Sequence, residues 1–164
     1  MKKVFFLSII CLMALTILSG CTEGEYVDLG LPSGTKWKTT NETNPNDTCD
    51  FFTYDEAMEK FGNQLPTSKQ WMELKTECDW SWDDTKKGYM ASGPNGNSIF
   101  LPAAGFGNHY GKAGGTGIGG YYWSSTPSVS GYAWSLDIYG GEIMSICDDK
   151  RCEEYSVRLV KGQD

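Results

Sequence analysis

The stretch GGYYWSSTPSVSGYAW, residues 119–134, contains five aromatic side chains among Gly, Ser, Thr and Pro. Aromatic residues at this density belong either to a packed core or to a binding face. Short apolar runs bounded by turn residues predict strands here and further along the chain. These strands are expected at 121–124, 133–139, 142–146 and 155–160, with Gly140-Gly141 as a tight turn.

The segment that leads into this stretch contains eight glycines between residues 105 and 120. Because Gly is unfavourable inside helices, we predict a long, irregular loop there. Further upstream, Asn95-Gly96 lies between two apolar runs, 88–92 and 98–101. Asn-Gly in this position is typical of a two-stranded hairpin.

Two earlier segments begin with a capping box, in which Ser or Thr is followed three residues later by Glu or Gln. Thr53 and Glu56 form the first pattern, with Gly62 as the helix end, and Thr67 and Gln70 form the second. Each predicts a helix of about 8 to 12 residues. Two helices followed by many short strands place the chain in the α+β class.

The N-terminus has the form of a secretory signal, with two lysines, an apolar run and small residues before Cys21. The run is too short for a membrane span, which takes about 20 apolar residues. The tetrad Leu18-Ser19-Gly20-Cys21 resembles the bacterial lipobox, which implies cleavage before Cys21 and its acylation, for example with palmitate. The alternative is an ordinary signal peptide followed by an incidental cysteine.

The lipobox reading divides the chain into a signal peptide at 1–20, a lipidated tether at 21–25 and one domain at 26–164. The acidic residues just after Cys21 resemble the surface-export signals of Bacteroidetes lipoproteins. We therefore expect an outer-membrane lipoprotein that is exposed at the cell surface.

The charge of the chain restricts its partners, because 21 acidic residues face 14 basic ones. Removal of the signal peptide takes two lysines away and leaves a net charge of about −9. Such a domain is repelled by a phosphate backbone, so we expect no nucleic-acid partner. The acyl chains, rather than electrostatic attraction to anionic lipid, are the expected membrane contact.

Four cysteines remain in the expected domain, namely Cys49, Cys78, Cys147 and Cys152. An even count in an exported protein indicates two disulfides, and four cysteines allow three pairings. Cys147 and Cys152 flank an expected hairpin tip, which favours the pairs Cys147–Cys152 and Cys49–Cys78. A zinc site is the alternative, but no Cys-x-x-Cys pair is present and His109 is the only histidine.

Five passages resemble a known bacterial family, and they occur in the family's order. They are YVDLGLPSGTKW (26–37), LPTSKQWMELKTECDWSW (65–82), GYMASGPNGNSIFLPAAG (88–105), GYYWSSTP (120–127) and SVRLV (156–160). Together they resemble the major paralogous domain family first named from Fibrobacter succinogenes, which is abundant in lipoproteins of gut Bacteroidetes. The resemblance implies a C-type-lectin-like fold, with two helices, short twisted antiparallel strands and long loops.

The resemblance also places Trp123 in a motif typical of a core strand. We expect a core that includes Trp123, Leu136, Ile138, Val157 and Leu159, with Trp134 assigned to it as well. Because side chains alternate along a strand, Ser135, Asp137 and Tyr139 are expected on the opposite, more exposed face. Arg158 is expected to be a partly buried hydrogen-bond or ion-pair donor rather than a ligand contact.

Ligand binding is expected in residues 126–156, where Tyr offers contact area at low entropy cost and Ser and Gly adapt to a partner. In relatives that are diversified by retroelements, this region carries the variable ligand-facing positions. The candidate residues are Tyr132, Asp137, Tyr139, Met144, Asp148, Asp149, Lys150 and Glu153. The expected ligand is an extracellular protein or glycan, and the alternative is that these residues only cover a surface.

Catalytic motifs are scarce, so we expect no enzyme activity, no catalytic residue and no cofactor. Ser124-Ser125 lacks the Gly-x-Ser-x-Gly context of a nucleophile, and nothing in the sequence supplies a partner for His109. Acidic pairs offer oxygen ligands for calcium, but the sugar-and-calcium motifs of calcium-dependent lectins are missing, so no metal site is expected. Two alternatives remain open: a structural or fimbrial envelope subunit, and an enzyme of the formylglycine-generating type.

Overall fold

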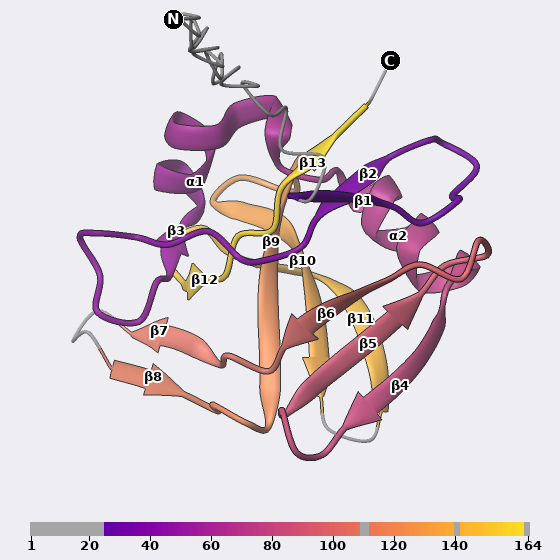
Figure 1. Cartoon of the computed structure of the whole chain (residues 1–164). Helices are drawn as coiled ribbons and strands as arrows, with labels where there is room; N and C mark the ends of the chain where they lie inside the picture. The colour runs from indigo at the N-terminus through magenta and orange to yellow at the C-terminus, as the bar shows by residue number, and fades with distance from the viewer. Residues whose placement is uncertain (1–24, 109–111, 140–141, 163–164) are drawn as a thin grey trace, which may run out of the picture.

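The computed structural model describes residues 25–108, 112–139 and 142–162 (Figure 1). The first part of the domain contains the strands β1 (Tyr26–Asp28), β2 (Lys36–Lys38) and β3 (Phe52–Thr53), and the helices α1 (Tyr54–Phe61) and α2 (Ser68–Glu77), with a 3-10 turn at Gly62–Gln64. The strands that follow are β4 (Asp79–Asp83), β5 (Gly88–Ser92), β6 (Ser98–Pro102), β7 (Phe106–Asn108), β8 (Lys112–Gly114), β9 (Gly119–Pro127), β10 (Tyr132–Tyr139), β11 (Glu142–Lys150), β12 (Glu154–Tyr155) and β13 (Val160–Lys161). The expected signal peptide and the lipidation site Cys21 lie outside the described residues.

The strands form small antiparallel sheets with the orders β1-β2-β13, β11-β10-β9, β3-β12-β7-β8 and β4-β5-β6. The first and last strands therefore share a sheet, and both ends of the described chain lie on the same side of the domain (Figure 1). This mixed α+β architecture, with two helices and short antiparallel strands, confirms the predicted class.

Both capping boxes are present as predicted. The Thr53 hydroxyl accepts a hydrogen bond from the Glu56 N–H, and Gln70 and Thr67 pair in the same way at the start of α2. Gly62 has a φ of 51°, a conformation that favours glycine, and it ends α1. The Nε1 of Trp71 donates to the Trp123 carbonyl at 3.2 Å, which ties α2 to β9.

The sheet β11-β10-β9 lies at the centre of the domain and packs on both faces. On one face, Leu136 and Ile138 join Trp71 and Leu74 of α2 in a core that we call the first cluster. On the other face, Trp123 and Ala133 belong to a second cluster. Its other buried members come from β3, α1, β12 and the segments that follow α1 and β12: Phe52, Tyr54, Ala57, Leu65, Tyr155, Val157 and Leu159. Alternate side chains of the central strands therefore enter different cores.

This arrangement decides where the aromatic side chains lie. Trp123, Leu136, Ile138, Val157 and Leu159 are all buried, as predicted. Trp134 is only half-buried, so its assignment to the core is wrong in part. The expectation that Ser135 and Asp137 lie on an exposed face is also wrong, because the second cluster and β12 cover that face and leave them 0% and 7% exposed. Tyr139, at the end of β10, remains 44% exposed.

Several strand boundaries differ from the prediction. The glycine-rich segment is not wholly a loop, because β7 and β8 pair as a hairpin within it. Gly105 permits the close approach of this hairpin, since a Cβ at this position would lie 2.1 Å from the Gly114 carbonyl oxygen. β9 and β11 each extend further than predicted, and the stretch 155–160 contains two short strands with an irregular segment between them. The expected turn at Gly140-Gly141 lies outside the described residues.

Candidate functional site

The predicted binding residues lie along the strands β10 and β11, which pair with each other, except for Glu153, which follows β11. Tyr132 is opposite Lys150 at one end of the pair, and Tyr139 is opposite Glu142 at the other end. At about 3.3 Å per residue, an extended strand separates Tyr132 from Tyr139 by about 23 Å. The candidates therefore do not form one site but divide among the two ends and the middle of the strand pair.

A groove of about 610 Å³ lies at the Tyr132 end of the strand pair. Three chain segments meet there, namely the start of α1, the start of β10 and the end of β11. The lining residues are Thr53, Asp55, Gly131, Tyr132, Lys150, Arg151 and Cys152. Two predicted binding residues, Tyr132 and Lys150, thus face one concave surface, and Lys150 is exposed and forms no ion pair with a described residue.

Backbone hydrogen bonds hold the three segments of the groove together. The Arg151 N–H donates to the Gly131 carbonyl at 3.0 Å, and the Tyr54 N–H donates to the Arg151 carbonyl at 3.2 Å. The Arg151 guanidinium lies 4.6 Å from the centre of the Tyr54 ring and pairs with the Asp55 carboxylate. Arg151 is therefore fixed by a ring, a carboxylate and the backbone, which gives the groove a defined wall.

Sequence reasoning missed Arg151, Thr53 and Asp55 as part of this groove. Thr53 and Asp55 precede Arg151 by almost a hundred residues, so only the fold brings them together. The nearest signal in the sequence was the pair Lys150-Arg151 in a strongly acidic chain. Cys152 was assigned to a disulfide, but in the structure it is an exposed thiol at the edge of the groove.

The middle of the strand pair carries Asp137 and Asp149, which meet at the hydroxyl of Ser135. Asp137 is buried, and this burial, followed by the charge of Asp149, raises its pKa from 3.8 to about 6. The Ser135 hydroxyl and the Cys147 thiol bond to Asp137 and act in the opposite direction. Asp137 therefore lies under the surface and is not placed to contact a ligand directly.

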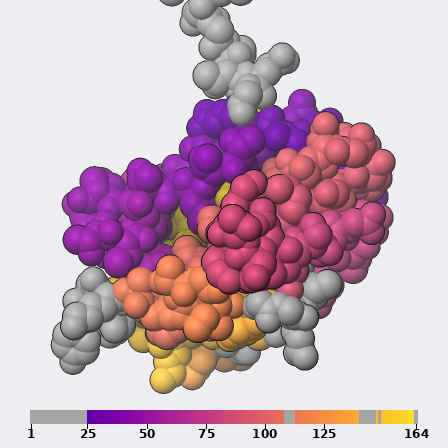
Figure 2. Space-filling view, turned by 60° about the horizontal axis from the view of Figure 1, so that its bottom comes forward, coloured from indigo at the N-terminus to yellow at the C-terminus, as the bar shows by residue number. Residues whose placement is uncertain are grey.

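The Tyr139 end of β10 lies on the side of the domain opposite to the two ends of the described chain (Figure 1). Figure 2 brings this side forward, and residues around β8 and the start of β9 form part of its surface. The hydroxyls of Tyr139 and Tyr121 are 2.7 Å apart, and Tyr121 stacks on Tyr155 with ring centres 5.1 Å apart. Burial and the bond to Tyr139 raise the pKa of Tyr121, so the Tyr121 hydroxyl stays protonated at neutral pH.

Glu153 lies near the groove end, where its N–H donates to the Lys150 carbonyl at 2.9 Å in the turn after β11. Met144 and Asp148 belong to β11, but their side chains lie outside what the structure describes, and so does His109. The backbone register places Asp148 opposite Trp134. The structure therefore brings Tyr132 and Lys150 together at the groove and places Tyr139 at the other end of the strand pair.

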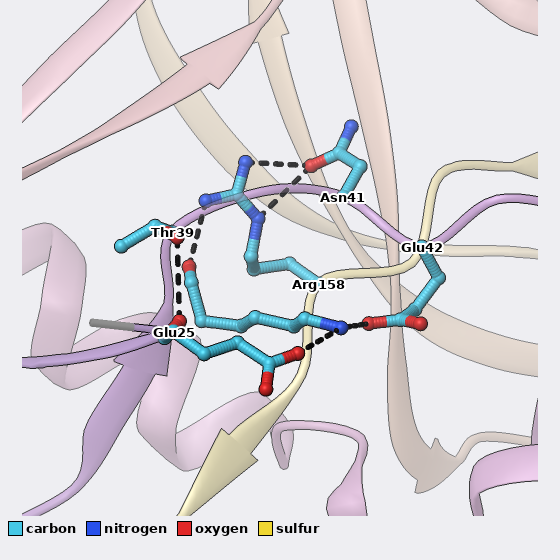
Figure 3. A network of polar contacts seen from close by, with 6 residues as sticks. Glu25, Thr39, Asn41, Glu42 and Arg158 are labelled. Atoms are coloured by element: carbon cyan, nitrogen blue, oxygen red, sulfur yellow. Dashed lines mark hydrogen bonds and ion pairs between the residues drawn. The ribbon is translucent and has the colours of Figure 1, made fainter. Parts of the chain in front are cut away.

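Arg158 belongs to a structural network rather than to a ligand site (Figure 3). It is 1% exposed, and its guanidinium donates to the Asn41 amide oxygen and to the carbonyls of Lys38 and Phe100 at 2.6 to 2.9 Å. Burial lowers its pKa. Lys38 in turn pairs with Glu25 and Glu42 (Figure 3). The prediction that Arg158 is a hydrogen-bond donor is confirmed, but the side chain is fully rather than partly buried.

The structure shows no disulfide among the described cysteines Cys49, Cys78, Cys147 and Cys152, so neither predicted pair is bonded. Cys78 ends α2 inside the first cluster, whereas Cys49 precedes β3, which packs in the second cluster. β11 continues as a strand through Lys150, so most of the residues between Cys147 and Cys152 are extended and do not form the expected hairpin tip. Because the predicted disulfides are not formed, the cysteines do not argue against the alternative of an enzyme of the formylglycine-generating type.

Within residues 25–108, 112–139 and 142–162, no group of three or more His, Cys, Asp or Glu side chains is arranged to hold a metal ion. No helix in this part of the chain is long and apolar enough to cross a membrane.

These features define a small α+β domain with a groove at the meeting point of α1, β10 and β11. The chain belongs to the family described as Domain of unknown function (DUF8237), whose model matches residues 74–160, more than half of the 164 residues. The match includes β10, β11 and the Lys150–Cys152 wall of the groove, but it begins after Thr53 and Asp55. No curated protein and no solved structure matches the chain.

Proposed function

We propose that this protein is a lipid-anchored envelope protein that binds an extracellular protein or glycan through the β10–β11 strand pair and its loops. The observation that carries the proposal is the groove in which Tyr132, Lys150 and Arg151 share one concave surface. A tyrosine ring and a cation that forms no ion pair with a described residue are groups that commonly contact ligands. The backbone bonds that fix Arg151 make the groove largely preformed.

The start of the described chain supports the proposed anchor. Glu25 is bonded in two ways, because its carbonyl accepts from the Thr39 N–H at 2.9 Å and its carboxylate pairs with Lys38. Glu25 is therefore bonded to the domain and lies four residues after Cys21, a length of chain that spans at most about 14 Å. A domain attached by an acylated Cys21 is thus held close to the membrane surface.

A C-type-lectin-like fold is part of the proposal. It is supported by the two short helices, the small antiparallel sheets and the pairing of β1 and β13 with the same strand, β2. In such a scaffold the loops vary while the core stays fixed, which agrees with a groove built from the ends of strands. A solved crystal structure of the domain, compared with C-type-lectin domains, decides this part of the proposal.

The binding proposal is tested by arrays of glycans and of extracellular proteins probed with the purified protein. For any interaction found, we expect Tyr132→Ala and Lys150→Ala each to lower the affinity at least tenfold, or about 1.4 kcal/mol. Lys86→Ala serves as the control, because its side chain is exposed and lies outside both the groove and the β10–β11 strand pair. If Tyr132→Ala and Lys150→Ala leave every interaction intact, the groove is not the binding site.

One observation favours the second candidate, an envelope assembly subunit. β11 is the outer strand of its sheet, and no other described strand pairs with its second edge. A free edge of this kind accepts an extended strand from another chain. Light scattering over a range of protein concentrations tests this candidate, since regular assemblies that persist on dilution support it and a monomer at all concentrations contradicts it.

A further inference from the structure

Ser135, Asp137, Cys147 and Asp149 form a polar group in the middle of the β10–β11 pair, which we call the carboxyl cluster. Ser135 is opposite Cys147 in the register, and the two aspartates approach Ser135 from its own strand and from the neighbouring one. The Ser135 Oγ lies 2.9 Å from Asp137 Oδ1 and 2.5 Å from Asp149 Oδ2. Both distances are those of hydrogen bonds between oxygens.

The protons available do not satisfy this geometry when both carboxyl groups are ionised. A serine hydroxyl has one hydrogen, and an ionised carboxylate only accepts. Ser135 can therefore donate to one aspartate, which leaves two oxygens without a hydrogen between them at the other contact. One additional proton on a carboxyl group resolves the conflict, because that carboxyl then donates to Ser135 while Ser135 donates to the other.

The groups that face the cluster supply no compensating positive charge. Tyr121 of β9 is opposite Asp137, Tyr155 of β12 lies near both aspartates, and Glu153 lies near Tyr155. Burial raises the pKa of Tyr121 and of Tyr155, so both stay neutral. Neither Asp137 nor Asp149 forms an ion pair with a described Lys or Arg. A proton is therefore the positive charge that remains available to the cluster.

We infer that Asp137 and Asp149 share one proton through Ser135, and that release of this proton as the pH rises weakens the packing of β10 against β11. Asp137 carries the proton, because its side chain is 7% exposed whereas that of Asp149 is half-buried. The inference rests on the strand pair alone and does not depend on the proposed ligand binding. It gives the two strands that reach the groove a dependence on pH.

The direction of the effect follows from the pKa of Asp137, which the fold raises from 3.8 to about 6. A group whose pKa is higher in the folded chain binds its proton more tightly there than in the unfolded chain. The resulting stabilisation is complete below about pH 4 and is lost as the pH rises through 6. The contribution of Asp137 to stability therefore falls across this window, whereas a paired carboxylate with a lowered pKa contributes in the opposite direction.

The direct test is an NMR titration of the purified protein in which the aspartate carboxyl carbons are labelled. We expect the Asp137 carboxyl to titrate with a midpoint near pH 6. In Asp149→Asn the like charge is removed and Ser135 is free to donate to Asp137, so the Asp137 midpoint falls by about one pH unit. Asp79→Asn, an exposed change on β4, is the control and leaves the midpoint unchanged.

A midpoint below pH 5 for Asp137, or one that does not respond to Asp149→Asn, overturns the inference. A second measurement covers the case in which Asp149→Asn does not fold. Urea unfolding of the original chain and of Asp137→Asn is followed from pH 4 to 8. The difference between their free energies of unfolding cancels the contributions of the titratable groups that both chains share. We expect the difference to change in favour of Asp137→Asn as the pH rises through 6, and a constant difference contradicts the shared proton.

Discussion

The two faces of the central sheet are both enclosed, yet they bury different chemistry. The face toward α2 carries the apolar side chains of Leu136 and Ile138. Tyr122 lies on the same face, and its hydroxyl donates to the Pro102 carbonyl at 2.6 Å. The opposite face begins with Trp123 and passes into the carboxyl cluster. Burying a carboxyl group is costly unless it is hydrogen-bonded. The comparison teaches that alternation along a strand decides the side a residue faces, but not how deeply it is buried.

The largest expected effect is on the second face, at Trp123. This side chain is 0% exposed, stacks on Tyr155 at 4.5 Å and donates from Nε1 to the Phe52 carbonyl at 2.8 Å. We expect Trp123→Ala to lower the free energy of unfolding by about 3–5 kcal/mol, measured by urea denaturation. Trp134→Ala removes the same side chain from a half-buried position and is expected to cost about 1 kcal/mol. Equal losses for the two variants would contradict the burial difference between them.

Much of the fold could be predicted because the signals were local. The capping boxes at Thr53 and Thr67 depend on residues within one helical turn, and the Asn95-Gly96 hairpin depends on a short turn between apolar runs. Trp123 was recognised through a motif. These elements are specified by neighbouring residues, so a single sequence is enough to find them.

The candidate site could be predicted only in part because it depends on contacts between distant residues. Tyr132 and Lys150 were found, but Asp55 and Arg151 meet across almost a hundred residues of chain. The exposure of Asp137 was misjudged for the same reason, since its cover comes from other strands and not from β10 itself. The alternation of side chains along a strand assigns each residue to one face of the sheet, but it does not show whether other elements cover that face.

The next prediction compares the reactivity of a thiol in the first cluster with that of a thiol at the groove. Cys78 packs in the first cluster, where burial raises its pKa to about 11, whereas Cys152 is exposed. At pH 8 roughly one Cys78 in a thousand is a thiolate, so we expect it to react with a thiol reagent at least about 100-fold more slowly than Cys152. Alkylation of the folded protein, with each cysteine followed by mass spectrometry, measures the two rates.

Alkylation without reductant in denaturant provides the control for the thiol prediction. Both cysteines are expected to react fully there, because the structure has them as free thiols. A cysteine that reacts only after reduction is in a disulfide, which would restore the pairing predicted from the sequence and contradict the free state. Rapid labelling of Cys78 in the folded chain would instead show that the end of α2 opens.

The smallest expected change in stability is the loss of an exposed tyrosine hydroxyl, compared with the loss of a buried one. Tyr139→Phe removes the 2.7 Å contact with the Tyr121 hydroxyl, and water can replace it at this exposed position. We expect a loss of less than about 0.5 kcal/mol in the free energy of unfolding. Tyr122→Phe is the matched change, because it leaves the Pro102 carbonyl without its donor inside the first cluster and is expected to cost about 1–3 kcal/mol. If both variants cost the same in urea denaturation, the Tyr139 end of the sheet is as enclosed as its centre, and the contrast between an open strand end and two closed faces fails.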